Sequence, residues 1–234
     1  MSDRLPQIIA IGGGGFYRDA ENLRLEQYVI RQSGAEQPRV AFVPTASGEP
    51  DHYVASFYAA FLKLDCRPSV LTFFKRTPEL RSYLLGQDVI YVGGGNTKTM
   101  LAIWSDWGVA QILREAWQAG IVLAGVSAGA ICWFEQGVTD SFSDKLCPLD
   151  CLGFLPGSCC PHYDGEAQRR PSYHELLSKD EISAGVAIED WTGVHYRGTE
   201  IYRVVASHNG ARAYSLRNVY GSVQEIPLPV EYLI

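Results

Sequence analysis

The chain has 234 residues, of which 47% are hydrophobic and 20% charged, as in an ordinary globular protein with room for a sizeable core. A formal net charge of −6 argues against nucleic acid or an anionic membrane as the main partner. The opening Met1–Pro6 is polar, and no apolar run is long enough to span a membrane. We therefore expect a single α/β domain over residues 1–234, located in the cytoplasm.

The first half of the chain alternates apolar runs with segments of helical periodicity. Five strands are predicted, at Ile8–Ile11, Arg39–Val43, Ser69–Phe73, Asp88–Val92 and Ile121–Val126. Helices are predicted over Asn22–Gln32, Asp51–Leu64, Pro78–Leu85 and Lys98–Gly120, the last with a break near Asp106–Gly108. This order predicts a doubly wound, mainly parallel sheet flanked by helices, with active residues at the carboxyl ends of its strands.

Four glycines, Gly12–Gly15, follow the first predicted strand. A phosphate-binding turn is the minority interpretation, because the ordered G-x-G-x-x-G with its downstream acid is not clearly present and no Walker lysine follows. We predict a loop at the carboxyl edge of the sheet.

The fifth predicted strand runs into Gly125-Val126-Ser127-Ala128-Gly129. A G-x-S-x-G segment between a strand and a helix is the nucleophile-elbow pattern, in which glycines permit a tight turn and the serine hydroxyl projects from the sheet edge. The alternative is a structural turn, in which small residues only allow close packing. On the first interpretation Ser127 attacks a carbonyl carbon.

A serine nucleophile needs a base within hydrogen-bonding distance. We predict that His162 is this base, because it follows Gln136–Pro161, which we expect to be a long functional loop, and because Pro161 stiffens its backbone. The other four histidines are expected to be surface or core residues: His52, His174, His195 and His208.

Beyond His162 we predict a helix around Ser172–Leu177 and then short strands. These are expected to add antiparallel strands at one edge of the sheet: Ala184–Glu189, Gly193–Tyr196, Glu200–Val205, Ala213–Leu216 and Glu225–Pro227.

An oxyanion hole needs backbone N–H groups directed at the reacting carbonyl oxygen. Gly93–Gly95 ends the strand expected to neighbour the elbow strand, so the amide of Gly94 or Gly95 and that of Ala128 are the candidates.

Six cysteines are present, and four of them lie between Cys147 and Cys160, close to His162. Their C-x3-C and C-C spacings do not form paired C-x-x-C zinc knuckles. We expect reduced thiols and neither a metal nor an organic cofactor.

Three ordered segments, Val92–Thr97, Gly125–Ala130 and Leu152–His162, together resemble the peptidase E and cyanophycinase family of serine peptidases. Pro44–Ser47 and Gly185–Thr192 are also similar to that family, so the likeness covers most of the chain. The resemblance implies a fold related to class I glutamine amidotransferases. It also implies that Ser127 is the nucleophile and His162 the base of an acyl-enzyme mechanism, with the Gly94 or Gly95 and Ala128 amides as the oxyanion hole.

The resemblance further implies an acidic residue soon after the nucleophile. We select Asp140; Glu135, Asp144 and a dyad without an acid remain open. An α/β-hydrolase esterase is less favoured, since His162 follows Ser127 too closely and no H-G-G-G loop precedes it. A class I amidotransferase would need cysteine in place of Ser127.

Peptidase E cleaves dipeptides with an N-terminal aspartate and carries its binding arginine in a Gly-Glu-Thr-Arg run after the catalytic histidine. The corresponding run here is Gly165-Glu166-Ala167-Gln168-Arg169-Arg170, which departs from that pattern. We name four candidate substrate contacts: Asn96, Gln168, Arg169 and Arg170. Dipeptide hydrolysis is the main expectation, with a small peptide as substrate and a monomer or homodimer as the assembly. The alternatives are an amide hydrolase of cyanophycinase-like or other non-aspartyl specificity, and an inert small-molecule binding module.

Overall fold

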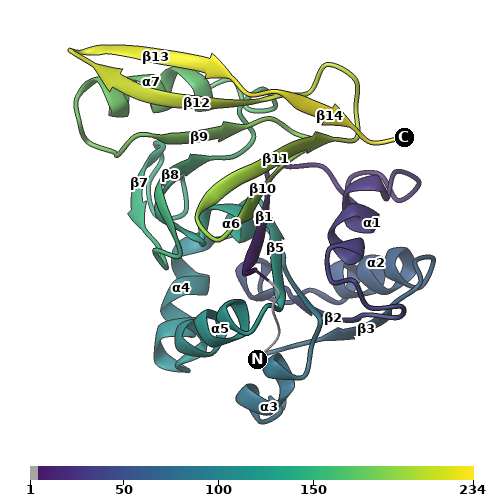
Figure 1. The fold of residues 1–234 in the computed structure, drawn as a ribbon. Helices are drawn as coiled ribbons and strands as arrows, with labels where there is room; N and C mark the ends of the chain where they lie inside the picture. Colours follow the sequence, from purple (N-terminus) through teal and green to yellow (C-terminus); the bar gives the residue numbers. More distant parts are fainter. Residues whose placement is uncertain (1–4) are drawn as a thin grey trace.

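The computed structural model describes residues 5–234, so part of the Met1–Pro6 segment lies outside the described residues. Within the described part, the chain forms two β-sheets, with helices on both faces of the larger one (Figure 1). None of the helices in this part combines the length and apolar character needed to cross a membrane.

The larger sheet has eight strands in the described residues, in the order β14-β11-β10-β1-β5-β4-β2-β3. Its parallel half has five strands, as predicted: β1 (Gln7–Ile11), β2 (Arg39–Val43), β3 (Arg67–Val70), β4 (Val89–Val92) and β5 (Val122–Val126). The bounds of the third are corrected, because β3 begins and ends earlier than the predicted Ser69–Phe73. β10 (Thr192–Arg197) pairs antiparallel with β1, followed by β11 (Glu200–Ala206) and β14 (Val230–Tyr232). β4 and β5 are neighbours, as expected.

Alternate strand residues of this sheet face two separate hydrophobic clusters. On one face, Ile9 and Phe42 pack with α1 (Arg24–Arg31) and α2 (Asp51–Phe61). On the other face, Ile8 and Leu123 pack with α3 (Leu80–Leu85), α4 (Thr97–Asp106) and α5 (Val109–Gln118). The predicted break between the last two helices is confirmed at Gly108, which has a φ of +66°.

The second sheet corrects two expectations. Its order is β13-β12-β9-β8-β6-β7. Its strands are β6 (Phe134–Thr139), β7 (Cys147–Asp150), β8 (Leu155–Cys160), β9 (Gly185–Ile188), β12 (Ala213–Val219) and β13 (Ser222–Pro227). Gln136–Pro161, expected as a loop, therefore contains strands. These strands were not predicted because they contain glycines and prolines, which are depleted in most strands.

Only two of the late predicted strands, those over Gly193–Tyr196 and Glu200–Val205, extend the edge of the larger sheet. The other three lie in the second sheet, where β9 runs parallel to β8. The last helix, α7 (Arg169–Ser178), packs Tyr173 and Leu177 against the second sheet through Val138 and Leu216.

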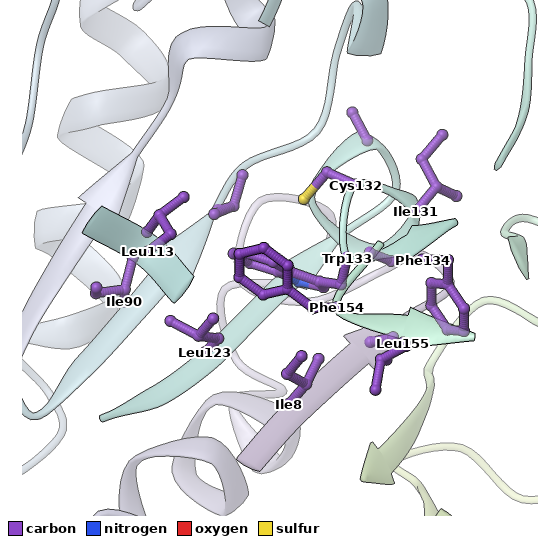
Figure 2. Close-up of a cluster of buried hydrophobic side chains, with 14 of the residues drawn as sticks. Ile8, Ile90, Leu113, Leu123, Ile131, Cys132, Trp133, Phe134, Phe154 and Leu155 are labelled. Atoms are coloured by element: carbon purple, nitrogen blue, oxygen red, sulfur yellow. The ribbon is translucent and has the colours of Figure 1, made fainter. Parts of the chain in front are cut away.

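The two sheets share one apolar core. Figure 2 shows Trp133 and Phe154 near the centre of a group of side chains that includes Ile8, Leu123 and Phe134, all members of the same buried cluster. The ring of Phe134 on β6 meets that of Tyr196 on β10 edge-to-face, with the ring centroids 5.7 Å apart.

Candidate active site

Ser127 lies in the turn between β5 and the short helix α6 (Ala128–Ile131). Its backbone is held at φ +58° and ψ −113°, an uncommon conformation for a residue with a side chain. Its N–H donates to the Ile11 carbonyl at 3.0 Å, and its carbonyl accepts from the Ala130 N–H at 2.8 Å. These two bonds fix the turn from both sides.

The flanking glycines are required by close packing. A Cβ on Gly125 would lie 2.3 Å from the Gly129 carbonyl oxygen, and one on Gly129 would lie 2.2 Å from the Val92 carbonyl oxygen. Packing thus explains the glycines of G-x-S-x-G, as the structural-turn alternative requires. It does not explain a serine in a strained conformation, which is typical of functional sites.

His162 follows β8 and faces Ser127. Its Nε2 lies 2.9 Å from the Ser127 Oγ, and its Nδ1 lies 2.7 Å from the Asp190 Oδ1. An ionised carboxylate only accepts hydrogen bonds, so Nδ1 carries the proton and donates to Asp190. Nε2 is then free to accept the hydroxyl hydrogen of Ser127. The geometry is that of a serine activated by an oriented imidazole.

Asp190 follows β9, the strand beside β8 in the second sheet. Burial acts to raise the pKa of Asp190, but the hydrogen bond from His162 and the nearby positive charges outweigh it and hold this pKa below the usual value. Those charges include Arg18 and Arg169. The carboxyl group is therefore ionised at neutral pH.

The acid expected beside His162 was Asp140, and the structure corrects this. Asp140 follows β6, is exposed, and lines a surface pocket with Asp144. Glu135 instead accepts from the Gly157 N–H at 2.8 Å. β6 and β9 lie on either side of β8 and run parallel to it. Asp140, which follows β6, and Asp190, which follows β9, therefore lie at the same edge of the sheet. The Nδ1 atom of His162 meets the carboxylate that follows β9. A sequence signal for Asp190 existed, since it directly follows the predicted strand Ala184–Glu189.

The glycine turn after β1 packs directly against the side chains of His162 and Asp190. A Cβ on Gly13 would lie 1.9 Å from the Asp190 Oδ1 and 2.5 Å from the His162 Nδ1. The Gly12 carbonyl also accepts from the His162 N–H at 3.3 Å. Only glycine permits so close an approach. The expected position of this loop, at the carboxyl edge of the sheet, is confirmed.

A cavity of about 510 Å³ opens beside Ser127 and His162. Its other lining residues are Gly14, Tyr17, Arg18, Ser47, Pro50, His52, Tyr53, Gly94, Gly95 and Val126. The rings of Tyr17 and Tyr53 meet edge-to-face with the centroids 4.6 Å apart. His52, expected as a surface or core residue, is exposed at this cavity.

The expected oxyanion residues lie next to the nucleophile. A Cβ on Gly94 would be 3.2 Å from the Ser127 Cβ, and the Gly94 N–H makes a long hydrogen bond of 3.4 Å to the Tyr53 hydroxyl. Gly95 has a φ of +136° and also lines the cavity. Ala128 directly follows Ser127 and begins α6. Burial raises the pKa of Tyr53 to about 12, although the Gly94 amide acts against this shift, so its hydroxyl remains protonated.

None of the four expected substrate contacts lines this cavity. The Asn96 side chain caps α4 by accepting from the Thr99 N–H at 2.8 Å, and its Nδ2 donates to the Ser141 carbonyl at 2.8 Å. Gln168 precedes α7 and lines the pocket that contains Asp140.

The two arginines of that run are also engaged. Arg169 is buried, pairs with Glu166 at 2.7 Å and donates to the Val138 carbonyl at 2.8 Å. Arg170 pairs with Glu225 and lies over the ring of Tyr163. These contacts anchor α7 to the second sheet. None of the residues Gln168–Arg170 lines the cavity beside Ser127.

All six cysteines carry free thiols. Within residues 5–234, no group of three or more His, Cys, Asp or Glu side chains is placed to hold a metal ion. Burial raises the pKa of the Cys160 thiol to about 12, with Arg169 acting against it, so this thiol stays protonated at neutral pH.

Comparison with known proteins gives consistent results. The model of peptidase family S51 matches residues 8–204. Over 230 residues the chain is 52% identical to "Uncharacterized peptidase YgaJ" of Bacillus subtilis strain 168, covering 98% of this chain and 100% of that protein. It is 27% identical to "Peptidase E" of Shewanella denitrificans, over 68% of each chain.

Among solved structures, a peptidase from an acI-B1 actinobacterium superposes with a TM-score of 0.76. The two chains are 21% identical, and the match covers 98% of this chain and 96% of the other. At this identity the likeness concerns the fold, and it extends over both sheets.

Proposed function

Since the chain belongs to peptidase family S51 and is a serine peptidase, we propose that Ser127, His162 and Asp190 form its catalytic triad. The observation that carries this proposal is the pair of hydrogen bonds made by one imidazole. His162 meets the Ser127 Oγ at 2.9 Å through Nε2 and Asp190 at 2.7 Å through Nδ1.

The reaction starts when Nε2 of His162 takes the hydroxyl proton as the Ser127 Oγ attacks the carbonyl carbon of the scissile bond. The carbonyl oxygen becomes negative, and the amides of Gly94 or Gly95 and of Ala128 are the donors we assign to it. Within the described part of the chain, the Gly94 N–H would have to give up a long hydrogen bond to the Tyr53 hydroxyl. Protonated His162 then donates its proton to the leaving amine. In the second half of the reaction, His162 takes a proton from water as the water attacks the acyl carbon, and it returns a proton to the Ser127 Oγ as the acyl group leaves.

Asp190 acts through His162. Its carboxylate keeps the proton on Nδ1, so that Nε2 faces the nucleophile as an acceptor, and it stabilises the imidazolium that forms. In this scheme it does not take the proton itself. No step requires a metal or an organic cofactor.

We infer that the substrate is a short peptide, because a cavity of about 510 Å³ accommodates only a few residues. The resemblance to peptidase E, a name that one of the matched relatives carries, favours dipeptides. The ion pairs of Arg169 with Glu166 and of Arg170 with Glu225 engage the two arginines that were candidates for binding a substrate carboxylate, which argues against a preference for an N-terminal aspartate. The free thiols support a reducing compartment, in keeping with the cytoplasmic expectation.

Covalent labelling combined with a dipeptide library tests this function. We expect a fluorophosphonate to label Ser127 in the folded protein, and Ser127→Ala and His162→Ala each to lower kcat by about 10⁴-fold or more. Ser178→Ala, which removes a hydroxyl that donates to the Glu175 carbonyl within α7, serves as the matched control and should retain activity. Failure of the probe to modify Ser127 would refute the nucleophile and leave the inert binding module as the better description.

A further inference from the structure

Arg18 brings a positive charge to the cavity beside Ser127. It is an exposed residue of the turn that follows β1, and it lines the cavity that contains Ser127 and His162. The turn is held by the Arg18 N–H, which donates to the Gly15 carbonyl at 3.0 Å. Among residues 5–234, no carboxylate lies within ion-pairing distance of its guanidinium, in contrast to the arginines of α7.

The remainder of the cavity offers Arg18 no partner of opposite charge. The described residues that line it are aromatic, small or neutral polar, apart from the two histidines, and none is an aspartate or glutamate. A guanidinium without a local partner in a mainly uncharged cavity is suited to a carboxylate, which it binds through two parallel hydrogen bonds. A substrate carboxylate would supply the missing negative charge.

The position of Arg18 indicates which part of the substrate it meets. Arg18 lies in the turn that follows β1 and lines the cavity together with His162. The same turn packs against His162 and Asp190 through Gly13. The proposed oxyanion turn instead packs on Ala46 through Gly95 and on Ser127 through Gly94. His162 delivers its proton to the leaving amine, so the residue that departs must lie on the side of Arg18.

We propose that Arg18 binds the α-carboxylate of the residue released by hydrolysis, and so restricts the enzyme to peptides with a free C-terminus one residue beyond the scissile bond. This inference rests on the proposed function of Ser127 and His162. In a dipeptide the α-carboxylate lies two bonds from the leaving nitrogen, within the reach of an arginine on the same side. A longer or amidated substrate would leave the guanidinium without its partner.

The test compares each dipeptide that the library identifies with its C-terminal amide. We expect the wild-type enzyme to prefer the free acid by about 10- to 100-fold in kcat/KM, the range of a charge-assisted hydrogen bond. In Arg18→Gln this preference should fall to about one, through a higher KM for the free acid. Arg18→Lys should retain part of it. Arg76→Gln removes the same charge from an exposed loop outside the cavity and should behave as the wild type.

A carboxylate on the first residue is the competing source, and the substrates Asp-Xaa and Asp-Xaa-amide distinguish it. If both are cleaved equally well by the wild type and both are lost in Arg18→Gln, Arg18 recognises the acidic side chain and the α-carboxylate assignment is wrong. An unchanged acid-to-amide ratio in Arg18→Gln also overturns it. Fluorophosphonate labelling separates the two levels. If wild-type Ser127 is labelled but the wild-type enzyme shows no preference for the free acid, only the inference is defeated, whereas unlabelled wild-type Ser127 defeats the proposed function itself.

Discussion

At the scale of single residues, two aspartates are candidates for the acid that orients His162. Asp190 and Asp140 both follow strands that flank β8, yet only Asp190 hydrogen-bonds to His162. We expect Asp190→Asn to lower kcat/KM by about 10³- to 10⁴-fold, because the amide would stabilise the tautomer in which Nε2 carries the proton. The matched change, Asp140→Asn, should leave kcat/KM near the wild-type value. Equal effects of the two substitutions on dipeptide hydrolysis would contradict the assignment.

Residues with a local signature could be predicted, and residues defined by tertiary contacts could not. Ser127 and His162 each lie in a short recognisable segment, and in the structure the Ser127 Oγ is 2.9 Å from the His162 Nε2. Arg18 belongs to no recognisable motif. Its place at the cavity depends on the path of the turn after β1, whose Gly13 packs against His162. Asn96 carried a misleading signal: an asparagine after a glycine turn suits both a substrate contact and a helix cap, and here it caps α4.

At the scale of elements, α1 anchors the loop that forms one wall of the cavity. Glu26 lies in its first turn and is fully buried, and its Oε1 accepts from the Phe16 N–H at 2.8 Å. Its Oε2 has no hydrogen-bond partner among the described residues. Burial raises the pKa of Glu26 to about 7, against the smaller opposing effect of backbone hydrogen bonds from Phe16 and Glu26 itself.

This carboxyl makes the stability of the protein depend on pH. Between pH 4.5 and about 7 the unfolded chain has released the proton while the folded protein still holds it, so the free energy of unfolding falls as the pH rises. We expect Glu26→Gln to remove this contribution, which is on the order of 3 kcal/mol. Urea denaturation at pH 4.5 and pH 8 measures the difference between variant and wild type. The exposed Glu200→Gln is the control. The control should keep the pH dependence of the wild type. An equal loss of it in Glu200→Gln, or its persistence in Glu26→Gln, would show that Glu26 is not the source.

At the scale of the whole molecule, the two sheets share one core, and Phe134 lies where they meet. It is 1% exposed and packs on Tyr196 of the other sheet. We expect Phe134→Ala to lower the free energy of unfolding by about 3–5 kcal/mol. Phe142→Ala, at an exposed ring, should cost far less. Both variants and the wild type should unfold in one transition, with coincident fluorescence and circular dichroism curves. Two separate transitions in the wild type would contradict the expectation of a single domain.

The inner strands of the parallel sheet were predictable because they are buried on both faces and form continuous apolar runs such as Ile121–Val126. The second sheet was not. β8 has the sequence Leu-Pro-Gly-Ser-Cys-Cys, in which turn residues outweigh those with high strand propensity, and its partners lie far along the chain. Long-range pairing, which local patterns do not encode, determines those strands.

The residues of the proposed triad come from both layers: the serine from the end of β5 in the larger sheet, the histidine and the aspartate from the ends of β8 and β9 in the smaller one. Neither sheet alone carries all three side chains. On the proposed function, Ser127 becomes reactive only when the two layers have docked. During refolding, the onset of Ser127 phosphonylation by a fluorophosphonate would therefore report the docking of the two sheets.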